Sequence, residues 1–185
     1  MTIDPKHAAA DPKRFYGAAD QGQLTQRYDE AADVYEEAMS TDVGWSGHLR
    51  LSEAVARHVA PDARLLDAGA GTGMLGTELA RRGFSNMDAN DLSAGMLERA
   101  RTKGIYGDCR VAMLGAALDE LVRITRKGGL VCYTLRSDDT PPGFAEKHDA
   151  LTRAGLWELV EAGEPFPSIA SEPHIRHRCW IWRVL

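Results

Sequence analysis

Segments with the spacing of amphipathic helices alternate with short, apolar, strand-like segments along most of this chain. Apolar residues between Leu24 and Met39 recur at the spacing of one helical face, which predicts a helix over residues 24–40. Further helices are expected over residues 48–60, 74–83, 93–104, 117–129 and 142–155. Strands are expected over residues 63–69, 85–91, 109–114, 130–136, 156–162 and 178–185. This alternation predicts an α/β fold with an open, mostly parallel sheet and helices on both of its faces.

The two C-terminal strands differ from the others because a proline-rich segment, GEPFPSIASEP, joins them. We expect residues 156–162 and 178–185 to form an antiparallel pair at one edge of the sheet. Trp180 and Trp182 fall on the same face of the last strand, which favours packing in a core or an interface. An exposed terminal strand would also permit a homodimer through this edge.

Composition narrows the class of protein. The chain has 185 residues, of which 44% are hydrophobic and 26% charged, and this suits one globular domain. We expect that domain over residues 21–185, after a flexible lead-in over residues 1–20. The net charge of −5 does not support a nucleic-acid-binding surface, and no apolar run is long enough to span a bilayer.

The three cysteines match no zinc-binding spacing and cannot all pair within one chain. A reducing, cytoplasmic location is therefore expected, without a metal site.

A glycine-rich loop follows the first expected strand, in the sequence DAGAGTG over residues 67–73. Glycines at a strand-to-helix turn let the backbone approach a ligand closely, and the next helix presents free N–H groups there. Residues 71–76 match the GxGxxG pattern of a dinucleotide site, with Asp91 placed to bind ribose hydroxyls. Asp67 favours another ligand, because a carboxylate would repel a pyrophosphate but attract the ammonium and sulfonium of S-adenosylmethionine.

The chain resembles the class I S-adenosylmethionine-dependent methyltransferases, whose fold is Rossmann-like. The resemblance rests on LLDAGAGTG, NDLSAGMLERAR and LDELVRITRKGGLVCYTLR, and it runs from about Tyr28 to the C-terminus. LSAGMLERARTKGIY and LTRAGLWELV are more narrowly similar to the methyltransferase-like proteins named after the Williams-Beuren syndrome chromosomal region. These motifs do not identify the methyl acceptor, for which we expect a small molecule.

The resemblance implies S-adenosylmethionine as cofactor, S-adenosylhomocysteine as product, and a role for each matching residue. Asp67 would orient the amino group of the cofactor, and Asp91 would accept both ribose hydroxyls. The other cofactor-binding residues would be Gly69, Ala70, Gly71 and Gly73 in the loop, Leu92, Met96, Met113 and Leu114 around the adenine, and Tyr28 and Tyr35 on a helical lid over residues 21–60. A simpler role stays open for each group of residues. Asp67 and Asp91 would each cap a helix, the apolar residues would belong to the core, and the two tyrosines would serve in packing alone.

One segment of the family pattern is absent after Leu114. About two dozen residues, including a fourth, central strand, are missing between residues 109–114 and the helix at 117–129, which exceeds an ordinary loop deletion. A true deletion would make residues 130–136 pair directly with the first strand in a six-stranded sheet. The alternative is that the sequence omits a segment.

No residue identifies itself as the base that would accept the acceptor's proton. Tyr133 and Arg136 lie at the carboxyl end of an expected strand, where ligands bind in α/β sheets, and His174 and His177 lie near the last strand. Three hypotheses therefore remain. The chain is a methyltransferase, a protein that binds S-adenosylmethionine or S-adenosylhomocysteine without transfer, or an NAD(P)-dependent oxidoreductase.

Overall fold

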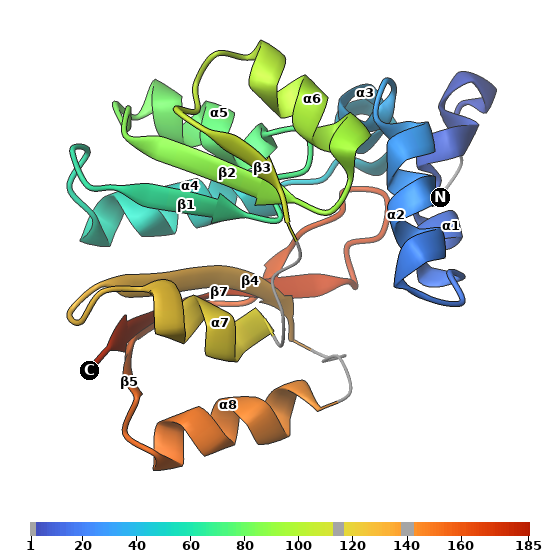
Figure 1. The fold of residues 1–185 in the computed structure, drawn as a ribbon. Coiled ribbons are helices and arrows are strands. Elements are labelled where there is room, and N and C mark those ends of the chain that lie inside the picture. Colours follow the sequence, from blue (N-terminus) through green and yellow to red (C-terminus); the bar gives the residue numbers. More distant parts are fainter. Residues whose placement is uncertain (1–2, 113–116, 138–142) are drawn as a thin grey trace.

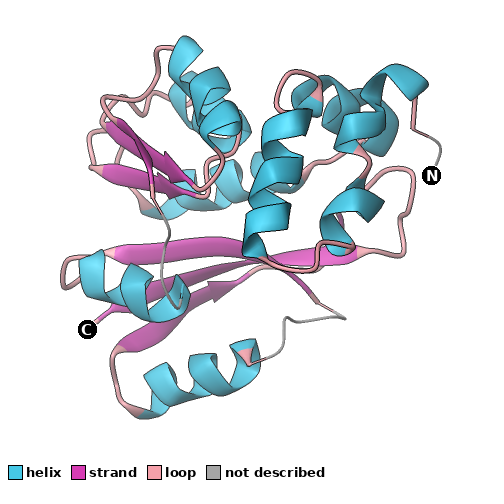
Figure 2. Cartoon of the chain, turned by 45° about the vertical axis from the view of Figure 1, so that its right-hand side comes forward, coloured by secondary structure: helices cyan, strands magenta, loops and turns pink. Residues whose placement is uncertain are grey.

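Strands and helices alternate in the computed structural model, which describes residues 3–112, 117–137 and 143–185 (Figure 2). The strands are β1 (Leu65–Ala68), β2 (Met87–Asp91), β3 (Cys109–Val111), β4 (Leu130–Arg136), β5 (Trp157–Ala162), β6 (Phe166–Pro167) and β7 (Arg176–Val184). The helices are η1 (Pro5–Ala10), α1 (Pro12–Tyr16), α2 (Gln21–Ala31), α3 (Tyr35–Glu37), η2 (Ala38–Val43), α4 (Gly47–His58), α5 (Met74–Arg81), α6 (Ala94–Thr102), α7 (Ala117–Ile124) and α8 (Phe144–Arg153). The α/β class predicted from the sequence is confirmed.

The described strands form two sheets (Figure 1). One is parallel, in the order β1-β2-β3, and the other is antiparallel, in the order β4-β7-β5 with β6 also paired to β7. The parallel arrangement is thus restricted to the first three strands. The antiparallel pairing of the two C-terminal strands is as predicted.

The expected pairing of residues 130–136 with the first strand is wrong for the described strands, because β1 pairs with β2 and β4 pairs with β7. Side-chain packing joins the sheets instead. Leu51 and Val55 of α4 share one buried cluster with Met87 of β2 and Ile181 of β7. Burial of apolar surface does not require strand pairing, so α4 can hold both sheets while their facing edges stay unpaired.

β7 is an interior strand, not the predicted edge strand. It is hydrogen-bonded to β4 on one side and to β5 on the other. The expected homodimer would need a free edge on this strand, and both edges are occupied by other strands of the same chain. Trp182 is buried and its ring stacks on Trp157 with centroids 4.7 Å apart. Trp180 packs against the same cluster, as expected for residues on one face.

The N-terminal residues are helical where a loose lead-in was expected. Asp4 and Asp11 cap η1 and α1, and a proline follows each cap at the start of its helix. His7 and Ala10 are 1% and 0% exposed. The apolar contacts of Ala10 and the contact of His7 Nδ1 with Oδ2 of Asp42, at 2.8 Å, therefore bind this segment to the rest of the molecule.

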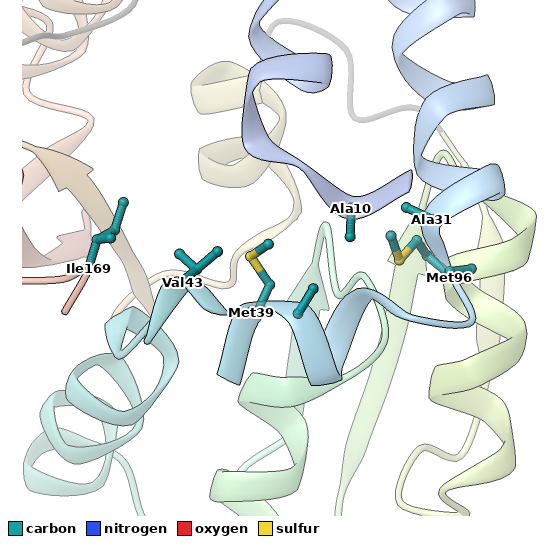
Figure 3. Packing of buried hydrophobic residues seen from close by; sticks show 8 residues of the cluster. Ala10, Ala31, Met39, Val43, Met96 and Ile169 are labelled. Atoms are coloured by element: carbon teal, nitrogen blue, oxygen red, sulfur yellow. The ribbon is translucent and has the colours of Figure 1, made fainter. Parts of the chain in front are cut away.

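The helix expected over residues 24–40 is broken by a turn at residues 32–34. The turn lets Tyr35 pack edge-on against Tyr28, with ring centroids 6.1 Å apart. Figure 3 shows the apolar cluster that results, in which residues of η1, α2, η2 and α6 meet. Its labelled members are Ala10, Ala31, Met39, Val43, Met96 and Ile169.

Candidate functional site

The carboxyl ends of β1 and β2 are tied together by the glycine-rich loop. The backbone N–H of Gly69 donates to the carbonyl oxygen of Asn90 at 2.9 Å, and the N–H of Gly71 donates to Oδ2 of Asp91 at 2.8 Å. Parallel strands end at the same edge of a sheet, and ligands of open α/β sheets bind outside that edge.

A cleft of about 190 Å³ lies at this edge. Gly69, Asp91 and Leu92 line one side of it, and Leu24 and Tyr28 of α2 line the other. Apolar, aromatic and carboxylate groups therefore meet in one hollow, which is typical of a small-molecule site.

Two glycines of the loop leave free space beside the backbone. Gly69 and Gly71 have φ angles of 71° and 56°, and a Cβ built on either would have no heavy atom within 4 Å. Only glycine adopts this left-handed conformation without strain. The loop therefore has room for a ligand to approach its backbone.

Both oxygens of the Asp91 carboxylate already accept backbone hydrogen bonds. Gly71 donates to Oδ2, and Ser93 donates to Oδ1, each at 2.8 Å. A carboxylate offers about four acceptor positions, so two stay available for hydroxyl groups of a ligand in the cleft. Ser93 is the N-cap of α6, as predicted, because its hydroxyl accepts the N–H of Met96.

Asp67 is buried and its carboxylate is held by two donors. The hydroxyl of Tyr106 donates to Oδ2 at 2.6 Å, and the backbone N–H of Gly76 in α5 donates as well. Burial raises the pKa of Asp67, while these two hydrogen bonds oppose that shift. The bond from Gly76 also fits the simpler interpretation, in which Asp67 caps the next helix.

Carboxylates of the N-terminal helices fasten them over this edge of the sheet. Oδ1 of Asp29 accepts the hydroxyl of Ser93 at 2.6 Å and the N–H of Gly95 at 2.8 Å, which joins α2 to the first turn of α6. Glu36 of α3 accepts the hydroxyl of Thr72, in the glycine-rich loop, at 2.9 Å. Within the range 21–60, where a lid was expected, α2 and α3 are therefore joined by side-chain hydrogen bonds to α6 and to the loop, which lie far from them in the sequence.

The two tyrosines predicted on the lid lie in different surroundings. Tyr28 lines the cleft, and its ring stacks on Phe15 with centroids 4.3 Å apart. Tyr35 packs behind it in the buried cluster. Burial raises the pKa of both hydroxyls, so both tyrosines are neutral at neutral pH.

The sequence was compared with known proteins. No family model matches the chain. Human methyltransferase-like protein 27 is 28% identical, in an alignment covering 80% of this chain and 73% of the human protein. A malonyl-[acyl-carrier protein] O-methyltransferase of Gallionella capsiferriformans is 27% identical, and the alignment covers 74% of this chain but only 50% of that protein.

Solved structures with a similar fold include methyltransferases. A 1,6-didemethyltoxoflavin-N1-methyltransferase of Burkholderia thailandensis superposes with a TM-score of 0.62 at 17% identity, covering 90% of this chain and 91% of that one. A TehB-like S-adenosylmethionine-dependent methyltransferase of Corynebacterium glutamicum gives 0.61 at 16% identity, covering 86% and 99%. The chain has the class I methyltransferase fold. Its resemblance to S-adenosylmethionine-dependent methyltransferases, first seen in the motifs, is confirmed.

The comparison with the human protein also bears on the missing segment of this methyltransferase fold. The alignment runs over 180 residues, whereas 80% of this 185-residue chain is about 148 residues, so about 32 positions face a gap in this chain. That number accommodates the segment that the motifs indicated as absent.

The remaining predicted cofactor residues are only partly at the cleft. Ala70 donates its N–H to Asn90 at 2.9 Å beside the cleft, while Gly73 lies at the start of α5. Met96 is 1% exposed and belongs to the buried cluster of Figure 3, so its expected adenine contact is replaced by a core position. Met113 and Leu114 lie outside the described residues.

The four catalytic candidates do not line the cleft. Tyr133 packs on the other face of its sheet, edge-on to Phe144 of α8 with centroids 5.9 Å apart. Arg136 lies opposite His177 in the register of β4 and β7, and Nδ1 of His177 is 2.6 Å from the hydroxyl oxygen of Ser168. His174 lies in an exposed turn. The structure therefore does not gather these residues around one reacting atom.

Sequence reasoning missed three residues of the site. Asp29 and Glu36 attach helices α2 and α3 to α6 and to the glycine-rich loop, and Tyr106 holds Asp67. Gly76 of α5 is small enough to admit the ring of Tyr106. The sequence shows this glycine, but no pattern along the chain connects it with Tyr106.

Proposed function

We propose that this chain binds S-adenosylmethionine in the cleft at the ends of β1 and β2 and transfers its methyl group to a small-molecule acceptor. The observation that carries the proposal is the cleft itself, where Gly69, Asp91 and Tyr28 meet. The methyltransferase names of both curated relatives support the same activity.

The residues present fit this cofactor. Asp91 has free acceptor positions for the ribose hydroxyls, and Leu92 offers apolar surface to the adenine. The open space beside Gly69 and Gly71 admits the methionine part. A dinucleotide fits less well, because its pyrophosphate would lie near the carboxylate of Asp67.

The cofactor supplies an electrophilic methyl group bound to a positively charged sulfur. A lone pair of the acceptor forms the new bond to carbon, the electron pair of the old bond passes to sulfur, and the acceptor's proton goes to a base or to water. The chain contributes by holding the cofactor in line with the acceptor and by excluding water under the lid. No metal is required for these steps.

A small acceptor is favoured by a solved structure with a similar fold. The similar fold from Burkholderia thailandensis was solved with 1,6-didemethyltoxoflavin and S-adenosylhomocysteine bound. We extend only the class of acceptor from that protein to this one.

The cellular location is part of the proposal. Cys109, Cys132 and Cys179 are all free, which suits a reducing compartment, and we place the protein in the cytoplasm. Among the helices that the structure describes, none combines the length and apolarity needed to cross a bilayer.

Transfer is tested with S-adenosylmethionine that carries a deuterated methyl group. The protein is incubated with a metabolite fraction and, separately, with a protein fraction of a cell extract, and mass spectrometry detects labelled products. We expect labelled small molecules with the wild type and a strong decrease with Asp91→Ala. Labelled protein alone would contradict the small acceptor. Tight cofactor binding without any labelled product would show that the chain binds the cofactor without transferring its methyl group.

A further inference from the structure

Tyr106 contacts the glycine-rich loop but is not among the residues that line the cleft. It follows α6, and its hydroxyl donates to Oδ2 of Asp67 at 2.6 Å. Its ring is half-buried and packs against two buried clusters, one with Met87 and the other with Ala89 of β2. A short hydrogen bond to an ionised acceptor is among the stronger interactions available to a tyrosine.

Two glycines make room for this ring. A Cβ on Gly76 would lie 1.9 Å from the Tyr106 hydroxyl oxygen and 2.4 Å from the ring carbon that carries it. A Cβ on Gly73 would lie 3.2 Å from another ring carbon. Gly69 and Gly71, in contrast, face open space. The four glycines thus divide into a pair that admits a ligand and a pair that admits Tyr106.

The charges around Asp67 show why a donor is needed. Burial and the nearby Asp91 raise the pKa of Asp67, whereas Tyr106, the N–H of Gly76 and the charge of Lys103 lower it. Without the hydroxyl of Tyr106, the carboxyl group would take up a proton at a higher pH. A protonated Asp67 has no charge with which to attract an ammonium group.

We propose that Tyr106 is a positioning residue that fixes the carboxylate of Asp67 for the amino group of S-adenosylmethionine. The inference rests on the proposed function and deepens it. It gives Gly76, the last glycine of the GxGxxG pattern, the role of making room for the ring of Tyr106. Tyr106 acts through Asp67 and does not touch the cofactor.

The test compares two ligands by calorimetry over a range of pH. S-adenosylmethionine carries the amino group, whereas 5′-methylthioadenosine has the same adenosine and sulfur without it. Tyr106→Phe removes only the hydroxyl. The control is Tyr16→Phe, at a tyrosine that is 80% exposed.

We expect Tyr106→Phe to weaken S-adenosylmethionine binding about tenfold at neutral pH and to leave 5′-methylthioadenosine binding unchanged. Binding of S-adenosylmethionine weakens as the pH falls through the pKa of Asp67, and this weakening should begin at a higher pH in the variant. In an Asp67→Asn background, Tyr106→Phe should cause no further loss.

Equal weakening of both ligands, with the pH profile unmoved, would assign Tyr106 a purely structural role and overturn the inference. Unchanged binding of S-adenosylmethionine by the variant would overturn it too, while leaving the proposed function intact. If the wild type binds neither ligand, the proposed function fails and the inference fails with it.

Discussion

Glycines of the loop at residues 69–76 serve different physical purposes although they look alike in the sequence. Gly69 and Gly71 adopt a left-handed conformation beside open space, whereas Gly76 is an ordinary helical residue pressed against Tyr106. The GxGxxG pattern therefore combines a backbone requirement with a packing requirement. Its match to a dinucleotide motif does not define the ligand.

Gly76→Ala tests this packing requirement. Alanine normally stabilises a helix interior by about 1 kcal/mol relative to glycine. Here the new Cβ would lie 1.9 Å from the Tyr106 hydroxyl oxygen, so we expect a loss of about 1–3 kcal/mol in the free energy of unfolding, measured in urea. In a Tyr106→Ala background the sign should reverse.

The matched control is Gly22→Ala in α2, where the new Cβ would meet only the carboxylate tip of Asp20, at 3.3 Å. A small change or a gain in stability is expected there. If Gly76→Ala also stabilises the wild type, the close contact with Tyr106 does not exist.

Sequence patterns located the residues that line the cleft better than the residues that support them. Asp91 and Tyr28 were predicted at the site and both line the cleft, because each belongs to a short motif. Tyr106 was not predicted, because its partner Asp67 lies 39 positions away and the contact depends on tertiary packing. Met96 was misplaced, since an apolar residue in a helix has the same pattern whether it faces a ligand or the core.

At the scale of elements, β1 has one paired and one unpaired edge. The N–H groups of Leu65 and Gly69 donate to carbonyl oxygens next to and within β2, at Asn86 and Asn90, each at 2.9 Å. Backbone groups of a strand alternate in direction, so Leu66 and Ala68 direct theirs to the other side, where no described strand pairs with β1. Leu66 is 43% exposed, which is unusual for an apolar residue of a parallel strand.

Amide hydrogen exchange, followed by NMR, tests this open edge. We expect the N–H groups of Leu66 and Ala68 to exchange at least about a hundredfold faster than that of Leu65, because only the latter is hydrogen-bonded to another strand. The N–H of Gly69 is a second protected control. Equal protection of all four groups would contradict an unpaired edge.

The positions of the strands along the chain were predicted from the sequence, but their pairing partners in the sheets were not all predicted. All six expected strands occur in the structure, including the mostly polar one over residues 85–91, which the alternation of strands and helices indicated. The interior position of β7 was not predicted, because the alternation of Trp180 and Trp182 specifies faces and not partners. The short strand β6 was missed within its proline-rich segment.

At the scale of the whole molecule, the chain has two sheets and an N-terminal helical layer (Figures 1 and 2). The parallel sheet supplies Gly69 and Asp91, and α2 supplies Tyr28. These parts match the half of a methyltransferase fold that is expected to hold the cofactor. Each of β1 and β4 has one edge with no partner among the described strands, and these edges mark the place where the absent fourth strand was expected.

Calorimetry of the wild type and of Asp91→Ala with S-adenosylmethionine, S-adenosylhomocysteine and NADH tests the central claim most directly. We predict that the wild type binds the first two ligands and not NADH. Asp91→Ala should weaken binding by roughly 1.5–3 kcal/mol, the value of a hydrogen bond to a charged group, while circular dichroism shows an intact fold. Binding of NADH but not of S-adenosylmethionine by the wild type would contradict the account, and unchanged affinity in folded Asp91→Ala would reduce Asp91 to a backbone cap.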